Sequence, residues 1–231
     1  MFQSTRSINR NFCANVSFQA HLGLTYAFIH GLDLREIQSF KECVRQLARL
    51  VVMPTFVPLV LLEFREGMCR KSLTDCQSAI EKIESETGLR PQWWSSRQRY
   101  IPKPSRSVLN EIDFEQVTQN ITSASTKVAY INYRCEIYLP ILDLMSRINK
   151  EIVDNVHLDQ KSDYELAELG IGNLIGRVKA LLECTLARAR YQTARADIQR
   201  QTVSKIDIEC IEIDLTFMPR FTAWWHKKRV P

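Results

Sequence analysis

Glycine is scarce in this sequence, with seven residues among 231. An all-β fold needs many tight turns, and glycine adopts their backbone conformations most readily, so this scarcity argues against that class. Long stretches are instead rich in Leu, Glu, Arg, Gln and Ala, which favour helices. Because 45% of the residues are apolar and 25% are charged, wholesale disorder is excluded as well. We therefore predict a mainly α fold of long amphipathic helices, with a small β contribution near the N-terminus and at residues 206–215.

The signatures of metal sites and of disulfide frameworks are missing. The seven cysteines are odd in number and include no CxxC pair, so we expect reduced, buried thiols. The four histidines lie far apart and lack the HExxH spacing of zinc enzymes. They are His21, His30, His157 and His226. We predict no metal ligand and no catalytic residue; a zinc site assembled from distant residues is the weaker alternative.

Motifs for nucleotide binding and for acyl transfer are also missing. The sequence contains neither a GxSxG run nor a GxxxxGK[ST] run. Residues 170–176 have G-x-G-x-x-x-G spacing, one residue off the dinucleotide pattern, and a helix is expected before them where that pattern needs a strand. We therefore predict that the protein binds no cofactor.

No apolar run is long enough for a membrane span. The uncharged and mostly apolar stretch at residues 50–62 contains Pro54 and Pro58, whereas a spanning helix needs about 20 apolar residues. Residues 1–19 are polar and lack the pattern of a cleaved signal peptide. Together with the expected reduced thiols, this predicts a soluble protein in the cytoplasm.

The spacing of apolar residues and local composition divide the chain into four ranges. Residues 1–87 are mixed and then helical, with strands expected before the His30-Gly31 turn and Asp33 as the N-cap of the first helix. Residues 88–109 form a basic linker rich in Trp and Pro, and 110–205 form a long-helix region. We expect Pro140 to kink or divide a helix, and Gly67 or the glycines of 170–176 to break one. Residues 206–231 combine a strand-like segment with a basic tail.

The strand-like segment carries a group of four acids. Residues 206–215 alternate apolar and acidic side chains and are rich in β-branched residues, which is typical of a strand. The four acids could bind a hard cation, but alternation alone places Asp207 and Glu209 on one solvated face, and we favour that interpretation. The four acids are Asp207, Glu209, Glu212 and Asp214.

Two basic segments contain adjacent tryptophans. Trp93 and Trp94 lie among Arg97, Arg99 and other bases, with no acid between residues 88 and 109. The nine positive charges of residues 88–109 and 216–231 exceed the net charge of +5, so the rest of the chain is net acidic. Such segments can bind a protein partner, stack on single-stranded nucleic acid or touch a membrane surface, or the tryptophans can simply fold onto the core.

The tail repeats this composition, since Trp224 and Trp225 precede three consecutive bases at 227–229. We take both segments as candidate partner-binding sites. A protein partner or self-association is favoured over nucleic acid, and peripheral membrane contact through these segments is left open.

Three short runs carry a resemblance to a known family. Residues 61–65 (LLEFR), 80–88 (IEKIESETG) and 188–199 (RARYQTARADIQ) resemble the soluble amino-terminal part of fungal CorA-like proteins, over roughly residues 32–203. The resemblance implies a cytoplasmic helical domain. Transporters of that family continue into two membrane-spanning helices joined by a Gly-Met-Asn loop, which this sequence lacks, so we expect no magnesium conduction by this chain alone.

The leading hypothesis is thus a non-catalytic helical protein that acts by protein contact, with self-association along a helix at 162–203. An accessory protein or enzyme of a fungal biosynthetic pathway is the alternative. Nucleic-acid binding through residues 93–106 is a third possibility, and it predicts an affinity that falls steeply with salt.

Overall fold

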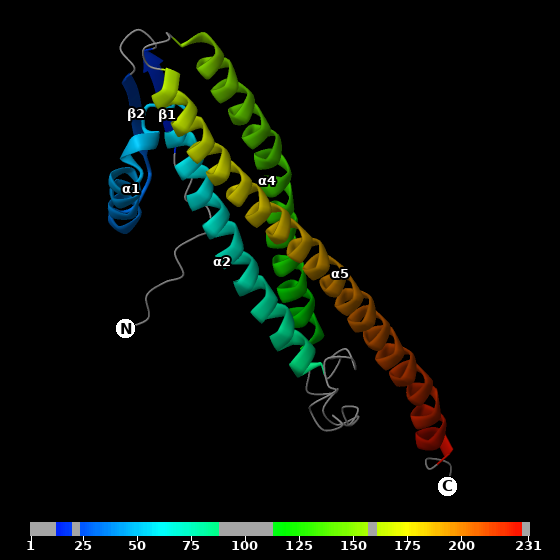
Figure 1. Cartoon of the computed structure of the whole chain (residues 1–231). Helices are drawn as coiled ribbons and strands as arrows, with labels where there is room; N and C mark the ends of the chain where they lie inside the picture. The colour runs from blue at the N-terminus through cyan, green and yellow to red at the C-terminus, as the bar shows by residue number, and fades with distance from the viewer. Residues whose placement is uncertain (1–12, 20–23, 88–112, 157–160, 228–231) are drawn as a thin grey trace, which may run out of the picture. The chain divides into compact units, whose positions relative to one another are not determined.

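The structure is a computed structural model that describes residues 13–19, 24–87, 113–156 and 161–227, with side chains in the last range described up to residue 205. A two-stranded antiparallel hairpin at the N-terminal end is followed by helices (Figure 1). The prediction of a mainly α fold with a small β contribution near the N-terminus is confirmed. Within the described ranges, no helix has a stretch both apolar and long enough to serve as a membrane span.

The hairpin consists of β1 (Cys13–Gln19) and β2 (Leu24–His30), paired so that Val16 faces Ala27. Gly31 follows with a φ of 96°, a backbone conformation that favours glycine and turns the chain out of the strand. The strands and the turn expected from the sequence are therefore present.

Helix α1 (Leu34–Gln46) begins with a complete capping box. The Asp33 carboxylate accepts hydrogen bonds from the backbone N–H groups of Arg35 and Glu36, each at 2.9 Å. In return, the Glu36 carboxylate accepts the backbone N–H of Asp33 at 2.7 Å. These bonds satisfy N–H groups that have no partner inside the helix, which explains why the helix starts at the predicted residue. A short 3-10 turn, η1 (Ala48–Leu50), connects it to the next helix.

Three long helices follow, and they are continuous where the sequence suggested breaks. They are α2 (Phe56–Glu86), α4 (Phe114–Asn155) and α5 (Lys161–Lys227). Gly67 lies inside α2, Pro140 inside α4, and residues 170–176 inside α5, so none of them divides a helix. A single glycine costs about 1 kcal/mol in a helix and a proline about 3, and the burial along these helices outweighs such local costs.

The strand predicted at residues 206–215 is wrong, because the backbone there continues α5. Alternation over ten residues is a local signal, and β propensity is a weak prior. A helix that has already formed gains one hydrogen bond for each residue added, whereas a new strand needs a partner strand. The candidate cation site on that strand loses its structural basis with the correction.

Each long helix buries a seam with alternating spacings of three and four residues. In α2 the seam is Leu59, Leu62, Glu66, Cys69, Leu73, Cys76, Ile80 and Ile83. In α4 it is Val117, Ile121, Ala124, Val128, Ile131, Cys135, Tyr138, Leu142, Met145 and Asn149, of which Tyr138 is half-buried. In α5 it is Ile171, Ile175, Val178, Leu182, Thr185, Ala189, Gln192, Ala196, Gln199 and Val203. This is the 3.5-residue period of coiled-coil packing, in which the seam of each helix faces its neighbours.

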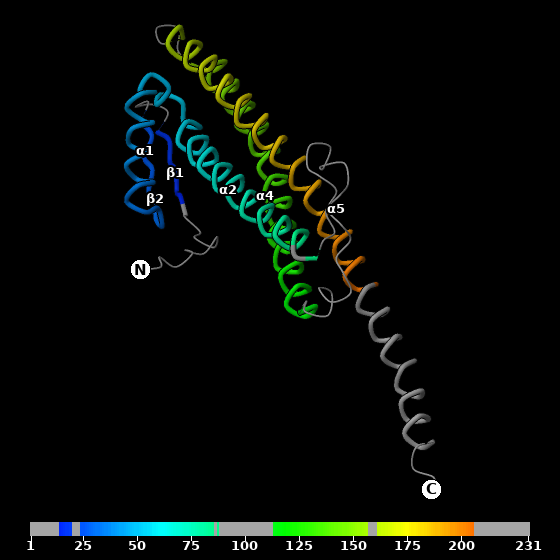
Figure 2. The backbone as a smooth tube through the Cα atoms, turned by 90° about the horizontal axis from the view of Figure 1, so that it is seen from below, coloured from blue at the N-terminus to red at the C-terminus, as the bar shows by residue number. Residues whose placement is uncertain are grey.

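The chain forms two compact units, and each takes a piece of all three long helices. The first unit contains Met1–Leu73 and Tyr130–Ala189, and the second contains Thr74–Ala129 and Arg190–Pro231. Within each unit, the pieces of α2, α4 and α5 that build its core lie side by side in two views at right angles (Figures 1 and 2).

In the first unit, polar contacts give the helix directions. Arg177 on α5 pairs with Glu63 on α2 at 2.6 Å, and further along both helices Thr185 donates a hydrogen bond to Glu66 at 3.0 Å. The two helices therefore run parallel. Helix α4 runs antiparallel to them, because its late residue Asn149 accepts a hydrogen bond at 2.5 Å from Thr55, which directly precedes α2.

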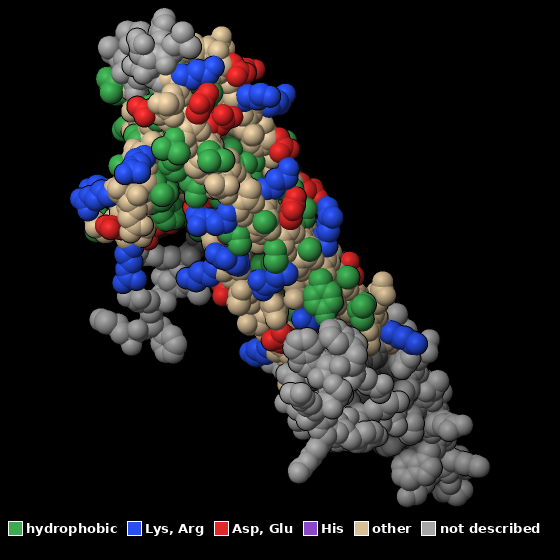
Figure 3. Space-filling view, viewed as in Figure 1, with side chains coloured by type: hydrophobic (Ala, Val, Ile, Leu, Met, Phe, Trp, Pro, Cys, Tyr) green, Lys and Arg blue, Asp and Glu red, His purple; other side chains and the backbone are tan. Residues whose placement is uncertain are grey.

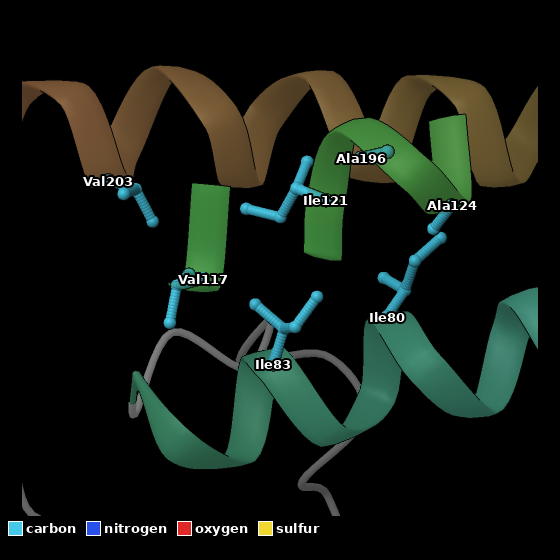
Figure 4. Packing of buried hydrophobic residues seen from close by; sticks show 7 residues of the cluster. All are labelled: Ile80, Ile83, Val117, Ile121, Ala124, Ala196 and Val203. Atoms are coloured by element: carbon cyan, nitrogen blue, oxygen red, sulfur yellow. The ribbon is translucent and has the colours of Figure 1, made fainter. Parts of the chain in front are cut away.

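The core of the second unit is a small aliphatic cluster supplied by all three long helices. Its members converge from three sides in Figure 4. They are Ile80, Ile83, Val117, Ile121, Ala124, Ala196 and Val203, with Phe114 packed against them. The small Ala124 and Ala196 give the helix backbones room to approach closely, so three helices can share one compact core.

Candidate functional site

The partner-binding candidates predicted from the sequence lie outside the part of the chain whose side chains are described. Trp93, Trp94, Arg97 and Arg99 belong to residues 88–112, and Trp224 and Trp225 belong to the end of α5. Their roles as partner-binding residues stay predictions. On the face seen in Figure 3, side chains of both charges are interspersed along the helices with apolar ones between them.

Exposed apolar side chains lie on the hairpin and in the first turn of α1, and we call them together the N-terminal surface. It consists of Leu24, Tyr26, Phe28, Leu34 and Ile37. Phe28 is 74% exposed and Leu34 is 85% exposed, although α1 is strongly amphipathic. No residue of α1 is buried, so the chain leaves the apolar face of this helix open to solvent or half-covered.

The hairpin is apolar on both faces. Leu24, Tyr26 and Phe28 share one face, since side chains alternate along a strand, and their partners on β1 are polar. Val16 and Phe18 lie on the opposite face, where they are half-buried. A two-stranded hairpin has little stability alone and depends on an apolar face being covered. The first face is not covered by the described residues, which makes it a candidate contact surface.

The α5 stripe predicted for self-association is mostly used inside the chain. Val178, Leu182 and Ala189 are fully buried in the first unit, whereas Leu166 and Leu169 at the start of the helix are 62% and 65% exposed. The buried part of the stripe is therefore not available to a second copy.

A polar layer interrupts the apolar seams of the first unit. Glu66 is only 1% exposed, and its carboxylate accepts the Thr185 hydroxyl and lies 3.6 Å from the Arg70 guanidinium. Arg65 and Arg134 are also buried, at 6% and 9% exposure. Buried charges are costly unless they are paired, so this layer favours one register of the helices over others.

Two thiols meet within this layer. Cys69 on α2 and Cys135 on α4 hydrogen-bond to each other, and Arg134 hydrogen-bonds to Cys69. The hydrogen bond from Cys135, with help from Arg134, lowers the pKa of Cys69, whereas the same bond and burial raise the pKa of Cys135. Cys135 is therefore the protonated thiol, and its S–H group is the donor in the hydrogen bond to Cys69.

Aromatic hydroxyls surround the guanidinium groups. The Arg134 guanidinium lies over the Tyr130 ring, 4.2 Å from its centroid, and hydrogen-bonds to its hydroxyl. Burial raises the pKa of Tyr138, and burial lowers the pKa of Arg65. The layer thus combines buried cations, a carboxylate and thiols with two phenols, of which Tyr138 is half-buried and Tyr130 is exposed.

In the second unit, a buried ion pair connects α2 to α5. The Arg195 guanidinium donates from Nε to Oε1 of Glu84 at 3.1 Å and from a terminal nitrogen to Oε2 at 2.5 Å. A further carboxylate, that of Glu81, lies 3.9 Å away, and Gln192 accepts another hydrogen bond from Arg195. This two-point geometry is the strong form of an arginine–carboxylate contact.

Between them, the polar layer and the Glu84–Arg195 pair contain carboxylates and thiols, side chains that bind metal ions when they cluster. Among the described residues, no three His, Cys, Asp or Glu side chains converge in a way that could hold a metal ion. The sequence predicted Cys69 and Cys135 as separate buried thiols. Their pairing depends on the register of α2 against α4, which the sequence pattern does not give.

No protein-family model matches the chain, and neither a curated protein nor a solved structure does so.

Proposed function

We propose that this chain is a non-catalytic helical protein that acts by binding another protein, including a second copy of itself. The observation that carries the proposal is the N-terminal surface. An amphipathic helix with a complete capping box and a hairpin with two apolar faces are well-formed elements, yet five of their large apolar side chains stay exposed. Exposed apolar patches on ordered elements are typical of protein interfaces, and aromatic residues such as Tyr26 and Phe28 often supply most of their binding energy.

We further propose, from the resemblance of residues 61–65, 80–88 and 188–199, that the chain is related to the cytoplasmic domain of fungal CorA-like proteins. These runs lie in α2, just beyond its end, and in α5, and they include several seam residues. A helical domain that works through contacts fits this relationship.

The test compares a surface variant with a matched control. Tyr26→Thr combined with Phe28→Thr removes both rings but keeps residues that favour strands. Leu166→Gln combined with Leu169→Gln removes two equally exposed apolar residues from α5. Neither pair should lower stability much, because substitutions at exposed positions usually change it by less than about 0.5 kcal/mol each.

Light scattering across a concentration series, and affinity capture with each variant as bait, supply the readout. We expect the wild type and the α5 variant to form the same higher-mass species or to retain the same partner, and the hairpin variant to lose it. A wild-type chain that stays monomeric at every concentration and captures nothing would refute the proposal. Equal binding by the hairpin variant would refute the assignment of the surface.

A further inference from the structure

We propose that Cys69 and Cys135 are a dithiol site that a peroxide converts into an intramolecular disulfide between α2 and α4. Cys69 and Cys135 are buried seam residues of α2 and α4, and each lies fourteen residues along the chain from the hydrogen-bonded pair Thr55 and Asn149. The antiparallel register set by that pair therefore brings the two cysteines to the same level in the first unit, where their thiols hydrogen-bond to each other. The pair is distinct from the N-terminal surface, so this inference does not depend on the proposed function.

The surroundings give the two thiols different roles. Arg134 hydrogen-bonds to Cys69 and is 9% exposed, so its charge acts on the sulfur with little screening by water. A thiolate is the nucleophile in thiol chemistry, and a neighbouring arginine stabilises it. The S–H group of Cys135 donates the hydrogen bond to Cys69. The carboxylates of Glu66 and Glu136 lie near Cys135, and their negative charge disfavours ionisation of its thiol. Cys69 is therefore the attacking thiol and Cys135 the resolving thiol.

The reaction balances with one peroxide for each pair. The Cys69 thiolate attacks one peroxide oxygen and the O–O bond breaks, which leaves a sulfenic acid on Cys69 and a hydroxide that takes up a proton to become water. The Cys135 sulfur then attacks the sulfur of Cys69, the S–O bond breaks, and the departing hydroxide takes the Cys135 proton as a second water. Two thiols lose two electrons in total, and the peroxide is reduced to two waters.

Burial decides which oxidants can react. Cys69 is 2% exposed and Cys135 is fully buried, whereas Cys184 on α5 is exposed. A bulky alkylating agent reaches Cys184 and not the pair, but hydrogen peroxide is small enough to enter during brief openings of the helices. This difference allows exposed thiols to be blocked before the pair is oxidised.

The experiment uses the full chain. Native protein is treated with N-ethylmaleimide to block exposed thiols, exposed to hydrogen peroxide, then denatured, alkylated with iodoacetamide and mapped by peptide mass spectrometry. We expect one peptide pair joined through Cys69 and Cys135, two hydrogens lighter than the two free peptides and separated by dithiothreitol. Because this readout uses the wild type, it does not depend on whether any variant folds.

Variants test the assigned roles. In Cys135→Ser the sulfenic acid has no resolving thiol, so dimedone should label Cys69; in Cys69→Ser both the disulfide and the dimedone label should be lost. Cys76→Ser, another buried α2 position, is the matched control and should form the disulfide as the wild type does. Recovery of Cys69 and Cys135 as free thiols after peroxide would overturn the site. Dimedone labelling of Cys135 in Cys69→Ser, as strong as that of Cys69 in Cys135→Ser, would overturn the assignment of roles.

Discussion

The ion pair between Glu84 and Arg195 gives the sharpest test of how the second unit is held together. The Glu84 side chain is 3% exposed and that of Arg195 is 13% exposed, so water screens their attraction little. Arg195→Met removes the guanidinium but keeps most of the aliphatic stem and its packing. The substitution leaves a carboxylate buried without its partner.

The expected cost follows from that geometry. Breaking a buried ion pair from one side typically costs about 3 to 5 kcal/mol, because the remaining charge stays desolvated. Glu84 loses two hydrogen bonds at once, so we expect about 4 kcal/mol off the free energy of unfolding. This is a large part of the total stability of a typical domain.

A matched control is available on the same helix. Arg200 pairs with Asp197 at 3.2 Å, but both side chains are 48% exposed, and exposed pairs contribute about 0 to 1 kcal/mol. Arg200→Met should therefore cost at most about 1 kcal/mol. The double variant Glu84→Met with Arg195→Met removes both charges and should recover most of the loss.

Urea unfolding followed by circular dichroism measures the wild type and these three variants, together with the single variant Glu84→Met. The coupling energy comes from the double-mutant cycle of Glu84→Met and Arg195→Met. Equal costs for Arg195→Met and Arg200→Met would refute the reasoning, because burial would then make no difference. A double variant as unstable as Arg195→Met would also refute it, since the loss could not come from the unpaired carboxylate.

Three other predictions follow from burial and backbone geometry. Leu182→Ala should cost about 2 to 5 kcal/mol in urea unfolding, because Leu182 is fully buried, whereas Leu166→Ala, at a position 62% exposed, should stay within about 0.5 kcal/mol. Gly172→Ala should raise the melting temperature, since an added Cβ meets no atom within 4 Å and alanine favours the helix by about 1 kcal/mol. Gly170→Ala should raise the melting temperature less, because its Cβ would lie 2.6 Å from a terminal methyl carbon of Leu50. Burial raises the pKa of Cys76 above its ordinary 9.0, so above pH 9 the unfolded chain binds fewer protons and stability falls as the pH rises through the folded-state pKa; Cys76→Ser should show a shallower fall between pH 8 and 11.

The helices themselves were readable from local pattern. The three- and four-residue spacing of apolar residues around Ile80, Val117 and Val178 reports one face of a single helix, and the cap at Asp33 depends only on the three residues after it. The same locality explains the error at residues 206–215. An alternating segment of ten residues suits a strand taken alone, whereas the continuing helix that precedes it decides the backbone.

The sequence by itself therefore determined the helical class, the hairpin and which side chains turn inward, since these depend on neighbours a few positions away. The tertiary structure alone decided which inward side chains meet. Arg195 and Glu84 are 111 residues apart, and Cys69 and Cys135 come from antiparallel helices. Such pairings depend on the direction and register of one helix against another, which the period of a single helix does not encode.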